Sequence, residues 1–187
     1  MKPIIWYHGG PRVTNWEHLR WDRDRHLSSP NDQGAGMYWT TDPEEASSYT
    51  YKVSDPVVYS ATMRDGFRLL PKQKPTLLAL YALYELAEPD DQETFLSNYR
   101  VEDYQSPSRE EIRSVLQKFS HQTSLFDAYT SLYVELFRYN ADAYVKAMQV
   151  LGYDGFIVEK GTTGGSRRRK HLVVWNPRKL EIEEEIG

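Results

Sequence analysis

The spacing of hydrophobic residues divides the chain into a helical middle part and two flanks of another kind. Between residues 108 and 119, apolar side chains recur at i, i+3, i+4 and i+7, the spacing of one helix face. Ser108 and Glu111 open this run with the spacing of a capping box, in which hydroxyl and carboxylate each bond a backbone N–H group. A similar stripe occupies residues 125–136. We therefore predict a helical subdomain over residues 76–150 that takes no part in a sheet.

The flanks carry short runs rich in Val, Ile, Tyr and Trp, which are typical of strands. One short helix is expected between them, because Asp42 suits an N-cap and Pro43 suits the first helical position. The order of strands, a helical block and further strands favours an α+β fold over an alternating α/β fold. The expected strands lie at residues 4–8, 36–40, 57–63, 67–70, 155–159 and 172–175.

Composition and charge exclude several classes of protein. The 187 residues fit one domain, and 14 Tyr and 5 Trp supply apolar area for a core. A net charge of −4 excludes a broadly basic nucleic-acid binder, and the net negative charge lies in residues 76–150, with 6 basic and 12 acidic residues. No apolar run reaches the length of a membrane span, and the first ten residues do not predict a secretion signal. We expect a cytoplasmic protein.

Several common kinds of site are excluded by residue type and spacing. With 0 Cys there is no disulfide, thiolate zinc site or cysteine nucleophile, and the 5 His lack the spacing of a metal site. No phosphate-binding loop of the Gly-x-x-x-x-Gly-Lys type occurs. Gly34-x-Gly36 precedes an expected strand rather than a helix, so it does not predict a dinucleotide-binding Rossmann turn.

Three segments combine polar or aromatic residues with glycine at the ends of expected strands. Residues 7–10 place a His at the end of an apolar strand, before two Gly. Residues 34–49 lead from Gly-x-Gly through Tyr and Trp to a capped helix that ends near a Tyr, and residues 151–180 contain Gly-Tyr-Asp-Gly, a basic loop and an apolar strand. Each segment also has a purely structural interpretation: a His in a turn, core aromatic residues, and a hairpin with a solvated loop.

In this order the three segments resemble the ADP-ribosyltransferase family, in its His–Tyr–Glu class of diphtheria-toxin-like and poly(ADP-ribose) polymerase-like enzymes. His8-Gly9 is similar to the His-Gly of the first family strand. Residues 152–155 and 173–177 are similar to the tail of small bacterial and phage members. The positions that match the Gly-x-Gly-x-Tyr and Ala-x-x-Tyr motifs of the family are Gly34, Gly36, Tyr38, Ala46 and Tyr49.

The resemblance implies a fold and a function. The fold is an α+β split β-sandwich, with residues 1–187 as a single domain and 76–150 as a helical insertion. The function is transfer of ADP-ribose from NAD to a macromolecular target, protein or nucleic acid, with release of nicotinamide, as in toxins of bacterial or phage conflict. NAD is then the co-substrate, and neither a metal nor a membrane is expected as a partner.

The chemistry of this reaction requires particular groups in the site. Nicotinamide leaves as a neutral amide, so no general acid is needed, while the ribose becomes an oxocarbenium ion, as in glycoside hydrolysis. The site must orient the dinucleotide and place negative charge beside the cation. By resemblance, His8 bonds a ribose hydroxyl, Tyr38 and Tyr49 flank the nicotinamide, and the backbone of Gly9 bonds the carboxamide. We expect His8, Tyr38 and Tyr49 to converge on one cleft.

The sequence departs from the family at its third motif. Family members carry a Glu just before the last Val-Val-aromatic strand, where this chain has Lys170 or His171. Three alternatives remain open. Glu159 or Asp154 supplies the acid, with Glu159 the expected choice; His171 replaces it by hydrogen-bonding a ribose hydroxyl; or activity is lost and the chain is a binding or interaction module that acts through its acidic helical block.

A basic run precedes the same strand. Arg guanidinium groups suit phosphate, so Arg167, Arg168 and Arg169 are candidates for a clamp on NAD or on a nucleic-acid target. Charge runs are also common in solvated loops, and this alternative remains open.

Overall fold

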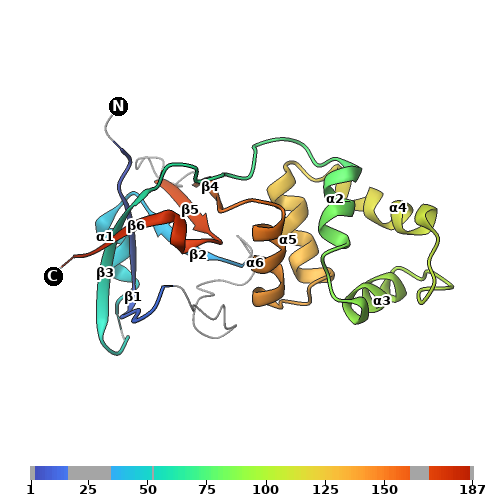
Figure 1. Ribbon diagram of the computed structural model, residues 1–187, viewed down its shortest axis with the longest axis horizontal. Coiled ribbons are helices and arrows are strands. Elements are labelled where there is room, and N and C mark those ends of the chain that lie inside the picture. The colour runs from blue at the N-terminus through green and yellow to red at the C-terminus, as the bar shows by residue number, and fades with distance from the viewer. Residues whose placement is uncertain (1–2, 17–34, 52, 161–168, 186–187) are drawn as a thin grey trace. The chain divides into compact units, whose positions relative to one another are not determined.

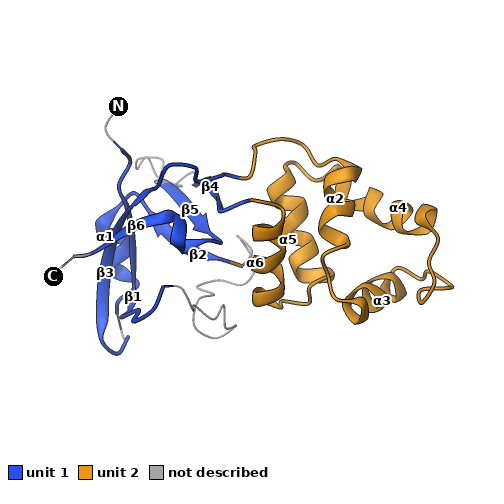
Figure 2. Ribbon diagram, viewed as in Figure 1, with its two compact units in different colours: residues 1–20, 36–69, 153–187 blue, residues 21–35, 70–152 orange. Residues whose placement is uncertain are grey.

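The computed structural model describes residues 3–16, 35–51, 53–160 and 169–185 (Figure 1). These residues form two compact units (Figure 2). The first unit holds all the strands and the short helix between them, and the second is built on residues 70–152. None of the described helices combines the length and apolar character needed to cross a membrane.

An antiparallel sheet of six strands, curled rather than flat, forms the first unit, so the α+β class is confirmed. Its strand order is β4-β5-β2-β1-β3-β6, so the N-terminal strands lie in the middle and the C-terminal strands pair on both sides of them (Figure 1). The strands are β1 (Trp6–Pro11), β2 (Met37–Thr40), β3 (Pro56–Met63), β4 (Gly155–Lys160), β5 (Arg169–Val174) and β6 (Leu180–Glu185).

The pairing is weakest at the centre of the sheet. β1 pairs with β3 along its whole length, and β2 does so with β5. Between β1 and β2, in contrast, only Tyr7 has a registered partner, Thr40. The sheet is therefore almost divided into halves, which diverge beyond this pair.

Strand register assigns side chains to the two faces of the sheet. Opposed residues of an antiparallel pair share a face, and neighbours along a strand alternate. Tyr7 opposes Thr40, which opposes His171, so these three share one face with Tyr38, and we call it the helix face. His8 opposes Tyr59, and Trp39 opposes Leu172. These four residues lie on the other side of the sheet, which we call the tryptophan face.

Helix α1 (Pro43–Ser48) packs on the helix face. The Asp42 side chain caps it by accepting from the N–H groups of Glu44 and Glu45, and Pro43 opens it, as the sequence predicts. The close approach depends on Gly9, since a Cβ there would lie 1.8 Å from the carbonyl oxygen of Ala46.

The second unit is helical throughout. Residues 70–152, all of which are described, contain no strand, as predicted for this block. Both halves of the predicted capping box form at Ser108 and Glu111. The helices are α2 (Leu77–Tyr84), α3 (Pro89–Asn98), α4 (Arg109–Gln117), α5 (Leu125–Glu135) and α6 (Ala141–Val150), with a 3₁₀ turn η1 (Lys118–His121) after α4.

One expected strand is wrong. Residues 67–70 form only an isolated parallel bridge, from Leu69 to Gly155. The backbone groups that a ladder would use are bonded to the neighbouring residue Asp154 instead. The Asp154 N–H donates to the Arg68 carbonyl at 2.8 Å, and the Asp154 carboxylate accepts from the Arg68 N–H at 2.9 Å.

Candidate functional site

His8 lies where β1 and β2 diverge. Its Nδ1 is 2.7 Å from the carbonyl oxygen of Tyr38 and replaces the backbone bond that the separated strands no longer make. A carbonyl only accepts, so Nδ1 carries the proton, and a neutral imidazole then presents Nε2 as an acceptor. The ring lies 5.3 Å from Trp39 and is stacked on Tyr59 at 6.5 Å. Both the orientation and the tautomer of His8 are thus fixed by its neighbours.

The two glycines after His8 have different structural roles. The space beside Gly9 is filled by the Ala46 carbonyl, so the packing of α1 alone is enough to require glycine there. At Gly10 a Cβ would instead meet His8 Nε2, at 3.2 Å. A side chain at position 10 would therefore press on the His8 ring.

The two candidate tyrosines lie on β2 and at the end of α1. Tyr38 is half-buried on the helix face, so its phenol and the imidazole of His8 project from opposite faces of the sheet. Tyr49 is the C-cap of α1 and is 46% exposed. Its neighbour Thr50 would contact a Cβ on Gly9, at 3.2 Å. The structure therefore brings His8 to the backbone of Tyr38, and the end of α1 to Gly9. The side chains of His8 and Tyr38 do not share a face, so they do not converge on one cleft as the sequence predicts.

A buried polar cluster occupies the helix face beside Tyr38. Glu45, from α1, reaches the sheet, where its Oε2 accepts from Thr40 Oγ1 at 2.6 Å. His171 Nε2, from β5, lies 3.1 Å and 3.2 Å from the two carboxylate oxygens. The side chains of His171 and Glu45 are 9% and 13% exposed. Because a carboxylate accepts, His171 donates from Nε2.

Sequence reasoning missed Glu45. Its position in the first turn of a capped helix suggests only a favourable interaction with the helix dipole. The signal that could have found it is the spacing from Thr40, since a short strand-to-helix turn brings the two side chains together.

The expected acid, Glu159, is not in this cluster. It is exposed on β4 and opposes Lys170 on β5, so it projects from the face opposite His171 and Tyr38. It shares the tryptophan face with His8, but three strand spacings of about 4.8 Å separate β4 from β1.

Asp154, the other acid weighed, has a structural role. It is buried, and besides Arg68 its carboxylate accepts from Asn176 Nδ2 at 2.8 Å. Its carbonyl also accepts the N–H groups of Trp175 and Asn176. The side chain thus joins the start of β4 to the end of β5.

The first glycine of the Gly-x-Gly motif and most of the basic run fall outside the described residues. Gly34, Arg167 and Arg168 lie outside them, as does the side chain of Arg169, whose backbone begins β5 opposite Lys160. Among the residues that are described, no group of three His, Asp or Glu side chains is placed to hold a metal ion.

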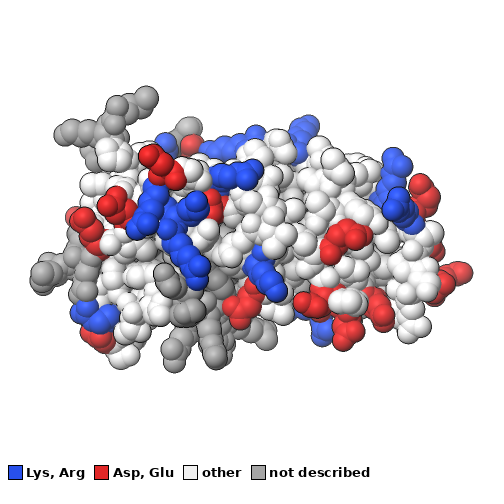
Figure 3. All heavy atoms as spheres, in the orientation of Figure 1, with Lys and Arg blue, Asp and Glu red and all other residues white. Residues whose placement is uncertain are grey.

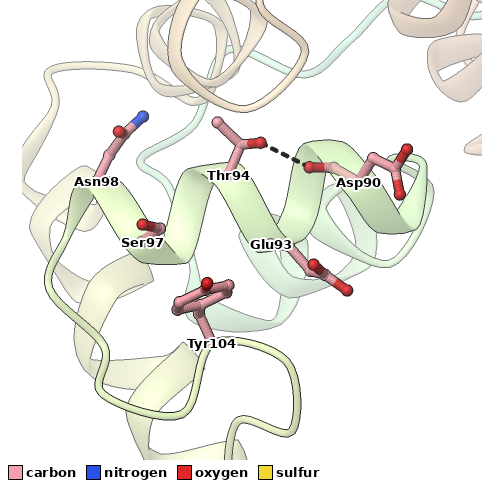
Figure 4. Close-up of a pocket in the computed structure, with 6 residues that line it drawn as sticks. All are labelled: Asp90, Glu93, Thr94, Ser97, Asn98 and Tyr104. Carbon is pink, nitrogen blue, oxygen red and sulfur yellow. Dashed lines mark hydrogen bonds between the residues drawn. The ribbon is translucent and has the colours of Figure 1, made fainter.

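The helical unit contains a hollow of about 360 Å³ on α3 (Figure 4). Thr94 Oγ1 donates within the helix to the Asp90 carbonyl at 2.8 Å. Acidic side chains also gather on the drawn face of this unit (Figure 3), and negative charge disfavours the pyrophosphate of a dinucleotide. The hollow is lined by Asp90, Glu93, Thr94, Ser97, Asn98 and Tyr104.

Comparison of the chain with protein-family models, with curated proteins and with solved structures finds no match. The functional argument therefore rests on the residues of the sheet and on their geometry.

Proposed function

We propose that this protein is an NAD-dependent ADP-ribosyltransferase, which transfers ADP-ribose from NAD to a macromolecular target and releases nicotinamide. The observation that carries the proposal is the setting of His8. Its Nδ1 bonds the Tyr38 carbonyl at 2.7 Å where β1 and β2 diverge, and its ring lies against Trp39 and Tyr59. A side chain held in this way fixes the strand that carries Tyr38, the residue proposed to contact the nicotinamide.

The proposed roles follow from what the reaction needs. The bond between ribose C1′ and the nicotinamide nitrogen breaks, its electron pair leaves with the neutral amide, and the ribose becomes cationic. His8 holds the backbone of β2 at Tyr38 through Nδ1. Tyr38 and Tyr49 flank the nicotinamide ring on the helix face, and the end of α1 sets their separation. An attacking hydroxyl, amine or carboxyl group of the target then bonds to C1′ and loses its proton to water.

The division of the sheet supports the same proposal. A split β-sandwich needs strands that separate in the middle, and β1 and β2 are registered only at Tyr7 and Thr40. His8 sits in this gap with contacts to both halves, Tyr59 on β3 and Trp39 on β2. A dinucleotide bound there has groups from both halves within reach.

A second function is favoured by a different observation. His171 and Glu45 are bonded to each other, and such a buried pair can serve stability alone. In that case the chain is a binding or interaction module, with the acidic helical unit as the surface for its partner.

Label transfer distinguishes the two functions. The protein is incubated with a cell lysate and NAD labelled in its adenylate half, and the products are treated with protease or nuclease to identify the class of target. We expect labelled macromolecules with the wild-type protein. Tyr38→Ala reduces labelling about five-fold or more if stacking on this ring positions the nicotinamide, since aromatic contacts contribute about 1 kcal/mol or more.

Tyr51→Ala is the matched control, because Tyr51 is 78% exposed and lies just beyond α1. It should label as well as the wild type. Absence of labelling with every variant, together with absence of NAD binding by the wild type in calorimetry, would reject the transferase and leave the interaction module.

A further inference from the structure

We infer that the carboxylate of Glu45 stabilises the cationic ribose, in place of a glutamate on β5. This inference rests on the proposed transferase function and names the acid for that reaction. Nothing in the sequence motifs assigns Glu45 a role, because the position lies in α1 rather than in the last strands.

The first argument is the position of the carboxylate. Glu45 bonds the side chain at position 171, where the sequence shows a His instead of the expected acid. Thr40, its second partner, is two residues from Tyr38 on the same strand and face. A negative charge therefore lies beside the position where the acid is missing, carried there by another element.

The second argument is that the carboxylate is held in place. Thr40 Oγ1 accepts from the Asp42 N–H at 3.2 Å, so its own proton is directed to Glu45. Bonds from α1, β2 and β5 thus fix one side chain that is 13% exposed. A fixed charge in a surrounding of low dielectric stabilises a developing cation without reorganisation at the moment of reaction.

Other acids near the sheet lack these features. Glu44 precedes Glu45 in α1 but is exposed, and Glu159 is exposed on the opposite face of the sheet. Asp154 is buried, but its carboxylate accepts from Arg68 and Asn176 at the far end of β5.

In the reaction, the C1′–N bond of NAD breaks and its electron pair leaves with nicotinamide. The ribose ring oxygen shares the positive charge with C1′, and the target nucleophile then forms the new bond at C1′ and releases a proton to water. Glu45 keeps its charge throughout and exchanges no proton. Its contribution appears in the turnover number rather than in the affinity for NAD.

The test compares Glu45→Gln with Glu44→Gln, which removes the same charge from the same helical turn. Nicotinamide release gives turnover, and calorimetric titration with NAD gives affinity. We expect Glu45→Gln to lower turnover about 100-fold, with affinity changed less than about three-fold, as for other groups that act in the transition state. Glu44→Gln should match the wild type in both.

A second variant covers the case in which Glu45→Gln fails to fold, as judged by near-ultraviolet circular dichroism. His171→Gln supplies an amide donor to Glu45 while the carboxylate keeps its charge. Turnover within about five-fold of the wild type supports Glu45, whereas loss of about 100-fold in folded His171→Gln overturns the inference and assigns the role to the imidazole.

The outcomes separate the two proposals. If the wild type releases nicotinamide and folded Glu45→Gln releases it equally fast, the inference fails and the transferase stands. If the wild type neither binds NAD nor releases nicotinamide, the proposed function fails and the inference fails with it.

Discussion

Gly9 and Gly10 are neighbours in β1, but a side chain would meet different atoms at each. At Gly9 it would lie 1.8 Å from the Ala46 carbonyl, a backbone atom that cannot move without α1. At Gly10 it would lie 3.2 Å from His8 Nε2, at the end of a side chain. Both substitutions therefore test packing, the first against the backbone of α1 and the second against the His8 ring.

We predict that Gly9→Ala destabilises the protein by about 1–3 kcal/mol or more, the usual cost of overpacking. Gly10→Ala should destabilise the protein less than Gly9→Ala, because its Cβ would meet a side chain at 3.2 Å rather than a backbone oxygen at 1.8 Å. Thermal unfolding of the two variants measures the difference. Equal losses of stability would contradict the distinction between the two contacts.

At the scale of residues, the sequence predicts contacts between positions that are close along the chain. The motif around His8 and the cap at Asp42 can be interpreted because each depends on residues within a few positions. The pair of Glu45 and His171 is separated by 126 positions and depends on how α1 meets β5. No spacing rule reaches that far, so the sequence alone does not indicate this pair.

At the scale of elements, the sequence did not predict β6 and α3, because acidic residues interrupt the apolar pattern of both. β6 consists of Leu-Glu-Ile followed by three Glu, a sequence that suggests a solvated end. Leu180 and Ile182 nevertheless alternate with Glu, and the strand lies at the edge of the sheet, where exposed charge is tolerated. α3 was missed for the same reason, although Pro89 and two Asp form a typical helix start.

The capping box of α4 gives a prediction for this scale. Ser108→Ala removes the acceptor for the Glu111 N–H and should cost about 1 kcal/mol of unfolding free energy. Ser106→Ala, two positions earlier and also exposed, is the control and should change stability by less than about 0.5 kcal/mol. Urea unfolding of both variants measures the difference, and equal stabilities would refute the cap.

The helical unit should also lose stability at alkaline pH. Burial, with a smaller contribution from Glu85, raises the pKa of Tyr84 from 10.0 to about 12. The unfolded chain therefore releases this proton first, so the stabilising effect is complete below pH 10 and is lost as pH rises toward about 12. Tyr84→Phe should show a smaller fall in melting temperature between these pH values, whereas an unchanged fall would contradict the assignment.

At the scale of the whole molecule, the segment of residues 70–152 leaves and re-enters the sheet unit at one place. Leu69 bridges Gly155, and the Asp154 N–H donates to the Arg68 carbonyl at 2.8 Å. The ends of the helical unit are thus adjacent within the sheet unit. This arrangement is that of an insertion, and it follows from long-range contacts that the hydrophobic pattern alone does not specify.

Replacement of residues 71–151 by a short Gly-Ser linker should therefore leave a folded sheet unit, because the linker need span only the distance between bridged residues. We expect a cooperative thermal transition, a strand-type circular dichroism spectrum and NAD binding within about five-fold of the intact chain. An unfolded or aggregated product would show that the sheet depends on the helical unit.

The most direct test of the proposed function is the release of nicotinamide from NAD by the 187-residue chain in the presence of lysate. We predict release that rises in proportion to the concentration of wild-type protein and falls about 100-fold in His8→Ala, which removes the side chain that bonds the Tyr38 carbonyl and positions this strand. Release at the background rate by the wild type, or release by folded His8→Ala equal to that of the wild type, would contradict the proposed function and the role of His8.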